Sequence, residues 1–192
     1  MQNGKTFCVG QSVERKDAVS KATGSALYID DYGYEGMLYA AAVRSPRPHI
    51  KLLSLSDKKA KTVKGFVTMV TSADVPGSKY WPMVAQDYPF LPVAEAKFAG
   101  EALALVVAET PEAAKAAAAL VELKYKELLF VDDPLVSLHS APVKLFGQDN
   151  IFSKYVVKRG DADKAFKDAD VVVEGNFATN YQVHGYLETQ GM

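Results

Sequence analysis

The amino-acid sequence predicts a globular protein of the α+β class, on the basis of its composition, local periodicity and length. Hydrophobic residues make up 48% of the 192 residues and charged residues 23%, a balance typical of chains that bury a core. Apolar runs with a two-residue period, typical of strands, alternate with helix signals, most clearly over residues 97–126. Because single domains most often hold about 100–150 residues, the length allows either one domain or one domain and part of a second.

The first half of the chain is expected to form an arm followed by short strands and helices. Residues 1–21 are polar and match neither period, which predicts an extended arm. The proline-rich residues 45–48 end a buried apolar run, and Gly65 is placed to form a left-handed helix cap. The expected elements are a strand at 37–44, a strand at 50–56, a helix at 57–63, a strand at 66–70 and a helical turn at 71–76.

Residues 77–92 form a loop rich in proline and aromatic residues, among them Trp81, Tyr88 and Phe90. The loop is too long for a simple connection, and loops of this kind often carry function. We therefore expect a surface that contacts a partner. The alternative, in which the aromatic side chains fold back on their own core, stays open because loop composition does not decide between the two.

The clearest local signals predict a strand–helix–strand unit. Residues 97–108 form the first strand, with Gly100 at a bulge or bend and an apolar end that is buried on both faces. Thr110 is an N-cap followed by a proline at the first helical position, so a helix over 111–120 is expected. Residues 121–126 alternate apolar and charged side chains, which predicts a second strand with a charged outer face.

The last third of the chain is expected to be a linker and the beginning of a second unit. Residues 128–150 contain three clusters of turn-forming residues and little periodicity. Strands at 153–158 and 170–178 are expected to flank a short helix at 161–168. About 50 residues rarely close a core unaided, so this second unit is expected to be incomplete.

Composition excludes several classes of partner and of covalent framework. The formal net charge is −1, which gives no positive field to attract nucleic acid or anionic lipid. The single cysteine, Cys8, permits no intrachain disulfide and no thiol-based zinc spacing, in keeping with a reducing compartment. No segment approaches the roughly 18–20 apolar residues of a membrane span, and the first residues do not have the pattern of a secretory leader. A cytoplasmic protein without a membrane anchor is expected.

Common catalytic motifs are absent from the sequence. It contains neither a glycine-rich phosphate loop nor the Gly-x-Ser-x-Gly, His-Glu-x-x-His and Cys-x-x-Cys motifs. Of the three histidines, only His184 lies near a carboxylate, Glu188, at a spacing of four. In a helix or a strand this spacing places both side chains on one side. The alternative, a packed histidine beside a solvated glutamate, is the more common arrangement.

Several stretches of sequence, in order along nearly the whole chain, resemble one enzyme family. They are residues 9–10, 15–18, 21–31 (KATGSALYIDD), 36–40, 43–46, 100–102, 106–110, 113–114, 121–125, 160–163, 165–166, 169–175 and 182–189 (QVHGYLET). The family is that of xanthine dehydrogenase and aldehyde oxidase, and the resemblance is to the start of its molybdenum-binding subunit. The resemblance implies an α/β hammerhead domain at 22–127 and the start of a molybdopterin-binding domain at 151–192. The arm at 1–21 precedes the first domain, and the linker at 128–150 joins the two.

The resemblance also implies a reaction and the groups that perform it. Members of the family hydroxylate a purine, another N-heterocycle or an aldehyde, using an oxygen that molybdenum takes from water. Electrons leave through 2Fe-2S clusters to FAD on partner subunits or domains. The implied partners are the remainder of the molybdopterin-binding subunit, the iron–sulfur and FAD subunits, and a small-molecule substrate.

The family's glycine-rich pterin loops, substrate-orienting residues and base glutamate lie downstream of the Gln-x-His-x-x-Leu-Glu stretch, beyond this sequence. We therefore expect an N-terminal fragment that is inactive alone, binds no molybdenum alone and holds no catalytic residue or metal ligand. The resemblance places Gln182, His184 and Glu188 near the cofactor edge of a complete subunit, with packing as the alternative role. A second hypothesis is a non-catalytic assembly module that docks partner subunits through residues 77–92 and the unfinished second domain.

Overall fold

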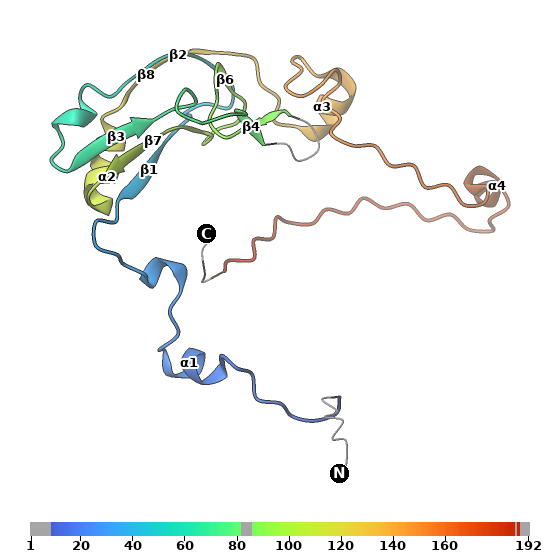
Figure 1. Ribbon diagram of the computed structural model, residues 1–192. Helices are drawn as coiled ribbons and strands as arrows, with labels where there is room; N and C mark the ends of the chain where they lie inside the picture. The colour runs from blue at the N-terminus through green and yellow to red at the C-terminus, as the bar shows by residue number, and fades with distance from the viewer. Residues whose placement is uncertain (1–8, 82–85, 187, 189–192) are drawn as a thin grey trace. The chain divides into compact units, whose positions relative to one another are not determined.

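The computed structural model describes residues 9–81, 86–186 and 188 of the chain (Figure 1). Internal contacts divide the chain at two points. Residues 36–170 form one unit, and the described residues before Gly36 and after Asp170 belong to the other. The larger unit contains all of the strands in the described part of the chain, so the core of the protein lies there.

The first sheet is built around the most apolar strand of the chain. Its order is β1 (Tyr39–Arg44), β7 (Ala102–Ala108) and β3 (Phe66–Val70), with antiparallel pairing on both sides of β7. Ala108 lies opposite both Tyr39 and Phe66. A strand in this central position has both edges hydrogen-bonded and both faces available for packing, which suits a continuous run of apolar side chains.

The second sheet has the order β6 (Glu95–Ala96), β2 (Ile50–Ser56) and β8 (Glu122–Glu127) and is also antiparallel. In β8, Leu123 and Tyr125 are half-buried, whereas the charged residues between and after them are exposed. This alternation confirms the amphipathic strand predicted from sequence. β7 and β8 belong to different sheets, so the strand–helix–strand unit joins the two sheets.

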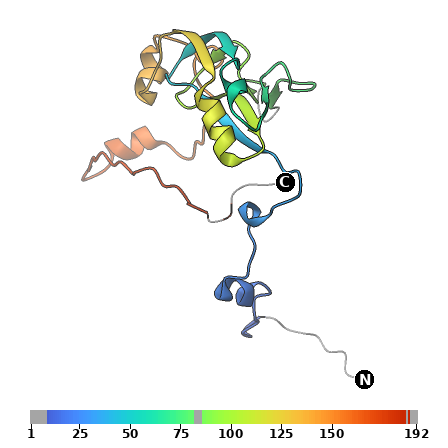
Figure 2. The same cartoon turned by 90° about the vertical axis from the view of Figure 1, so that its left-hand side faces the viewer.

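Helix α2 (Pro111–Ala119) connects these two strands and covers the first sheet. The Thr110 hydroxyl oxygen accepts a hydrogen bond from the Ala113 amide at 3.1 Å, as an N-cap does. Ala114 and Ala117 are buried on the face of the helix that contacts β1 and β7. Figure 2 shows this yellow-green helix lying against the strands. Small side chains allow this close approach of the helix to the sheet.

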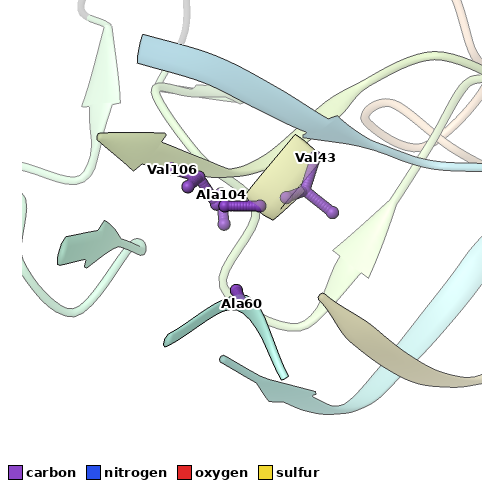
Figure 3. Close-up of a cluster of buried hydrophobic side chains, with 5 residues drawn as sticks. Val43, Ala60, Ala104 and Val106 are labelled. Atoms are coloured by element: carbon purple, nitrogen blue, oxygen red, sulfur yellow. The ribbon is translucent and has the colours of Figure 1, made fainter. Parts of the chain in front are cut away.

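Two clusters of buried side chains lie on opposite sides of β7. One consists of Val43, Ala60, Ala104, Val106 and Ala117, and Figure 3 labels the first four. The other consists of Ile50, Ala96 and Leu103. Because successive strand residues point to opposite faces, Leu103 and its neighbour Ala104 enter different clusters. This confirms that the apolar end of the predicted strand is buried on both faces.

The loop at 77–92 contains a small hairpin of β4 (Tyr80–Trp81) and β5 (Tyr88–Pro89). Trp81 and Phe90 meet edge to face, with ring centroids 5.6 Å apart. Both rings remain almost half exposed, whereas Leu91 is buried. The aromatic side chains thus pack partly on one another, and the proposed partner contact stays a prediction.

Several boundaries differ from those expected. The helix expected at 57–63 is a single 3-10 turn, Ala60–Thr62, and the residues at 71–76 form turns only. The strand expected at 97–108 begins at Ala102, because Gly100 turns the chain with a φ of +86°. A further 3-10 turn, Ile29–Asp31, was not predicted.

Two helices lie where an arm and a linker were expected. The first is α1 (Ala18–Thr23), a short polar helix ended by Gly24 in the left-handed conformation. The second is α3 (Pro134–Ser140), whose Asp133 carboxylate accepts hydrogen bonds from the amides of Leu135 and Val136. Residues 132–134 belong to one of the turn-forming clusters from which a linker was predicted, but at a helix N-terminus Asp133 acts as a cap and Pro134 as the first helical residue.

The strands expected at 153–158 and 170–178 do not form in the described residues, whereas the helix between them does. This helix is α4 (Ala162–Lys167), and the Asp161 carboxylate caps it by accepting a hydrogen bond from the Lys164 amide at 3.0 Å. A helix satisfies its own main-chain groups, but a strand needs a neighbour to do so. None of the helices in the described part of the chain is long and apolar enough to cross a membrane.

Candidate functional site

The three residues that the resemblance placed near a cofactor lie after the last helix. Gln182, His184 and Glu188 are exposed and belong to no helix or strand. The imidazole of His184 stacks on the ring of Tyr186, with centroids 5.4 Å apart and planes 19° apart. Among the described residues, no hydrogen bond or ion pair joins His184 to Glu188. The spacing of four therefore corresponds to no shared helix face here.

The segment that carries these residues exposes its large apolar side chains. Val173 is 88% exposed, Phe177 is 96% exposed and Tyr181 is fully exposed. Ligand pockets in proteins cover most of the surface of the group that they hold. The described residues of this segment provide no such enclosure.

A polar site with buried side chains lies instead in the unit of residues 36–170. The turn between β1 and β2 is fixed by Ser45, whose hydroxyl donates to the Arg47 carbonyl at 2.8 Å. Ser45 also exchanges main-chain hydrogen bonds with the turn at Gly100 and Glu101, which joins the end of β1 to the start of β7. The prolines at 46 and 48 restrict φ, so this turn presents the next residue, His49, in one orientation.

His49 is 5% exposed and is held from two directions. Its carbonyl accepts a hydrogen bond from the Leu128 amide at 3.0 Å, and its Nδ1 lies at hydrogen-bond distance from the Leu129 carbonyl oxygen. Its Nε2 has no hydrogen-bond partner among the described residues and lies 3.7 Å from Oε2 of Glu95. His49 also lines a cavity of about 360 Å³, with walls that include Lys97, Leu128, Val143, Lys144 and Leu145. The Nε2 atom itself is covered by the surrounding protein atoms.

Glu101, from the Gly-Glu-Ala stretch, is buried on the neighbouring side of the same region. One carboxylate oxygen accepts a hydrogen bond from the Lys97 amide at 2.6 Å. Burial raises the pKa of Glu101, and the main-chain hydrogen bonds from Lys97 and Phe98 oppose this rise. Glu101 lines a second cavity of about 250 Å³, to which Glu95, Lys97 and Tyr80 also contribute.

The chemistry of this region favours binding over covalent catalysis. Its two cavities are lined by three carboxylates, one imidazole and two ammonium groups, and the described residues contain no cluster of three metal ligands. His49 and Glu95 were not predicted as site residues, because the sequence separates them from each other and from Leu128 and Val143. The signals that could have indicated them are a histidine in a proline-rich turn and the charged residues that flank Gly100.

Two family patterns match the chain, one after the other. The pattern of the aldehyde oxidase and xanthine dehydrogenase a/b hammerhead domain matches residues 23–129, more than half of the chain. The chain belongs to the aldehyde oxidase and xanthine dehydrogenase family. The pattern of the molybdopterin cofactor-binding domain matches residues 146–192, so the hammerhead domain of this family member is followed by the start of a molybdopterin-binding domain. The fold class and the family resemblance predicted from sequence are confirmed.

Relatives and solved structures agree with this membership. A probable xanthine dehydrogenase subunit of Bacillus subtilis is 36% identical over 92% of this chain and 24% of its own length. The nicotinate dehydrogenase large molybdopterin subunit of Eubacterium barkeri is 30% identical over 96% of this chain and 44% of its own length. The aldehyde oxidoreductase of Desulfovibrio gigas matches 82% of this chain and 19% of its own, with 26% identity and a TM-score of 0.75. The chain thus spans less than half of each of these relatives.

The described residues do not by themselves fit a molybdopterin. Within the described part of the chain, the segment after Asp170 forms no enclosed cradle, and its candidate residues have no hydrogen bond that would fix their orientation. Oxygen and nitrogen atoms in a defined arrangement are needed to hold such a group. The side chains described in this segment are exposed, so no packing against a core sets their arrangement. No catalytic step is therefore assigned to the residues of this chain.

Proposed function

We propose that this chain provides the hammerhead domain and the opening of the molybdopterin-binding domain in a molybdenum hydroxylase. The proposed reaction is the hydroxylation of a purine, another N-heterocycle or an aldehyde with oxygen derived from water. The observation that carries the proposal is the succession of the two family patterns, at 23–129 and 146–192, in one chain. Chemistry at molybdenum belongs to the complete subunit in this proposal, and the chain alone is inactive.

The roles proposed for the two regions follow from their burial. Residues 22–127 form the folded domain that contains the buried core, and an arm at 1–21 precedes it. A linker at 128–150 leads to the opening of the cofactor domain at 151–192. Because apolar side chains of the latter are exposed, they are expected to be covered by the rest of the subunit.

Gln182, His184 and Glu188 are proposed to lie at the edge of the cofactor once the subunit is complete. Their motif is part of the family resemblance, and their side chains are free to take up new partners because they are exposed. The partners proposed for the whole enzyme are the remainder of the molybdopterin-binding subunit and the subunits or domains with 2Fe-2S clusters and FAD. The 2Fe-2S clusters and FAD of these partners would carry electrons away from molybdenum.

The test is to produce the chain with the missing part of the subunit and the electron-transfer partners, and to measure molybdenum, pterin and turnover in the purified complex. A complex with molybdenum, pterin and turnover is expected. His184→Ala is expected to lower molybdenum content and turnover, and His139→Ala, on α3, serves as the matched control. A complex that assembles without molybdenum and pterin would contradict the proposal, and a loss of stability alone in His184→Ala would contradict the role of this residue.

A second candidate function is a non-catalytic assembly module. It is favoured by the hairpin in residues 77–92, which leaves Trp81, Tyr88 and Phe90 about half exposed. Aromatic residues of this kind often provide the anchors of protein interfaces. Trp81→Ala is expected to weaken binding to a partner subunit in size-exclusion chromatography, with Leu53→Ala on β2 as an exposed control. Unchanged assembly in Trp81→Ala would exclude the hairpin as the docking surface.

A further inference from the structure

The outer face of the second sheet carries lysines that the proposed function does not use. Lys51 on β2 and Lys124 and Lys126 on β8 are exposed, and Figure 1 shows these two strands running side by side. The opposite face of the same strands packs against the core. Because side chains alternate between the two faces of a sheet, the three lysines share the face that is open to solvent.

The register of the sheet places two of these lysines directly opposite each other. Lys51 lies opposite Lys126 in the antiparallel pair of β2 and β8, and Lys124 lies two residues before Lys126. Directly opposite residues have Cβ atoms about 5 Å apart, and like charges at such positions destabilise a sheet. The pair therefore does not serve the stability of the fold. A negatively charged group bound to both lysines would remove the repulsion.

The carboxylates of β8 are already paired with other cations. Glu122 lies 2.7 Å from the ammonium of Lys59, and Glu127 lies 3.0 Å from the guanidinium of Arg47. Among the residues that the structure describes, no ion pair or hydrogen bond involves the ammonium groups of the three lysines on this face. Their charges are therefore available to a partner.

Glu122 also relates a fourth lysine, Lys58, to this face. The pKa of Glu122 is lowered mainly by Lys59 and, to a smaller extent, by the charges of Lys124 and Lys58. Lys58 is exposed and lies just after the end of β2. Residues 50–59 and 122–127 together hold five lysines and three carboxylates, whereas the whole chain has a formal net charge of −1. We call Lys51, Lys58, Lys124 and Lys126 the lysine face.

Glu95 lies on the other neighbour of β2, the short strand β6. It is opposite Lys51 in the register, but no ion pair joins the two side chains among the described residues. Its Oε2 lies 3.7 Å from Nε2 of His49 instead. Glu95 reduces the positive field at this edge of the sheet, so the field is strongest toward β8.

An extended acidic segment matches the lysine face in charge and in spacing. Residues two apart in an extended chain lie about 6.6–7 Å apart on one side, which is also the separation of Lys124 and Lys126 along β8. Carboxylates at alternate positions can therefore reach successive lysines. Nucleic acid matches less well, because its affinity comes from many phosphate contacts and from bases stacked on aromatic rings. Neither β2 nor the outer face of β8 contains an aromatic residue.

The charge of the face favours a partner that associates transiently. Permanent interfaces are mostly apolar, whereas charge complementarity chiefly speeds association and selects the partner. The side chains proposed to be covered by the rest of the subunit are the apolar ones after Asp170. The lysine face has the opposite character, so it suits a separate protein.

We propose that the lysine face binds an extended acidic segment of a separate protein that associates transiently with this one. Its carboxylates lie over Lys124 and Lys126 and relieve the repulsion between Lys126 and Lys51. This binding function is independent of the oxidoreductase function proposed above.

The test uses two acetylated hexapeptides, one alternating serine with glutamate and the other serine with glutamine. The full chain, labelled with ¹⁵N, is titrated with each peptide, and the amide resonances of Lys51, Lys124 and Lys126 are followed. The glutamate peptide should shift these resonances and bind at least about tenfold more tightly than the glutamine peptide. Its affinity should fall about tenfold between about 20 and 200 mM salt, because salt screens exposed charges. Equal binding of the two peptides, an affinity independent of salt, or shifts confined to other residues would overturn the proposal.

Charge variants relate the binding to the lysine face. Lys126→Glu turns the like-charge pair with Lys51 into an opposite-charge pair, so peptide affinity should fall at least about tenfold while the thermal unfolding midpoint does not fall. Lys124→Gln removes one charge and should weaken binding about threefold. Lys115→Glu, at an exposed position on α2, changes the net charge as much as Lys126→Glu and should keep the affinity within about twofold. Unchanged binding in Lys126→Glu, or an equal loss in Lys115→Glu, would overturn the proposal.

Two further measurements address other occupants of the face. A short DNA duplex and phosphatidylserine vesicles, tested at the same salt concentration, should bind more weakly than the glutamate peptide. Tighter binding of either would overturn the proposal, because it would assign the face to a nucleic acid or a membrane. In the assembled enzyme, a fluorescent form of the glutamate peptide should still bind, as measured by anisotropy. Loss of binding there would show that the enzyme itself covers the face, and it would overturn the assignment to a separate protein.

Discussion

Two segments that were both predicted to form strands have opposite fates. β7 has the sequence ALALVVA and is buried on both faces between β1 and β3. Residues 171–178 have the sequence VVVEGNFA, form no strand and leave Val173 and Phe177 about nine-tenths exposed. The second segment contains Glu174, Gly175 and Asn176, residue types that are uncommon in strands. The neighbours differ as well, because only β7 has strands on both edges and packed side chains on both faces.

Two helices repeat the comparison. α2 and α4 begin in the same way, with a side-chain oxygen of Thr110 or Asp161 that accepts a hydrogen bond from a main-chain amide. α2 buries two alanines against the first sheet, whereas α4 buries no residue. Local signals are therefore sufficient to start a helix, and tertiary contacts decide whether the helix contributes to a core.

The largest expected effect distinguishes the buried strand from the exposed run. Leu103→Ala removes a side chain that is 1% exposed and should lower the free energy of unfolding by about 2–5 kcal/mol. Val173→Ala should change it by less than about 0.5 kcal/mol, because this side chain is 88% exposed. Urea unfolding followed by circular dichroism measures both. Similar losses in the two variants would show that residues 171–178 are packed in solution.

The second effect concerns the buried carboxyl of Glu101. Glu101→Ala leaves the Lys97 amide without its acceptor and should lower the free energy of unfolding by about 1–3 kcal/mol. Glu101→Gln retains an oxygen that can accept the hydrogen bond and should be clearly less destabilising at neutral pH. The same urea experiment measures both variants. An equal loss in the two would indicate that packing of the side chain, and not the hydrogen bond, stabilises this turn.

A smaller effect separates the two capped helices. Thr110→Ala removes the N-cap of α2 and should lower the free energy of unfolding by about 1 kcal/mol. Asp161→Ala removes the cap of α4, which packs on no core, and should leave the global unfolding midpoint unchanged. Hydrogen exchange should instead show faster exchange of the α4 amides alone. A shift of the global midpoint in Asp161→Ala would mean that α4 is coupled to the core.

The smallest effect is a pH dependence within the larger unit. The raised pKa of Glu101 means that the folded state holds this proton more tightly than the unfolded chain. Its contribution to stability is present below the ordinary pKa of 4.5 and is lost as the pH rises through the raised value. The stability of Glu101→Gln relative to wild type should therefore increase as the pH rises through this range. Unfolding midpoints measured at several pH values test this, and a constant difference would contradict the shift.

Elements with strong local signals were predicted closely. The strands at 50–56 and 66–70 have the predicted bounds, and α2 ends one residue earlier than expected. Other elements were missed because the same local sequence is compatible with two different structures. Asp133 and Pro134 are typical of turns, yet they also cap and begin a helix, as they do in α3. Residues 153–158 could form a strand only with a neighbouring strand to pair with.

The site divides in the same way. Residues 100–102 were recognised from sequence as part of the family resemblance, but Glu101 was not predicted as a site residue. The cavity beside His49 could not be recognised, because its walls come from residues near 49, 95, 128 and 143, which lie far apart in the chain. Gln182, His184 and Glu188 stay a prediction, since the described structure gives them no packed surroundings.

The sequence by itself determined the family, the α+β class and the elements that depend on neighbours in the chain. Caps, prolines and two-residue periods act over a few residues, so their effect is encoded locally. The tertiary structure decided that β7 is central in one sheet while β8 belongs to another, and that the buried Nε2 of His49 faces Glu95. These features depend on hydrogen bonds and packing between residues distant in sequence, which only the folded chain brings together.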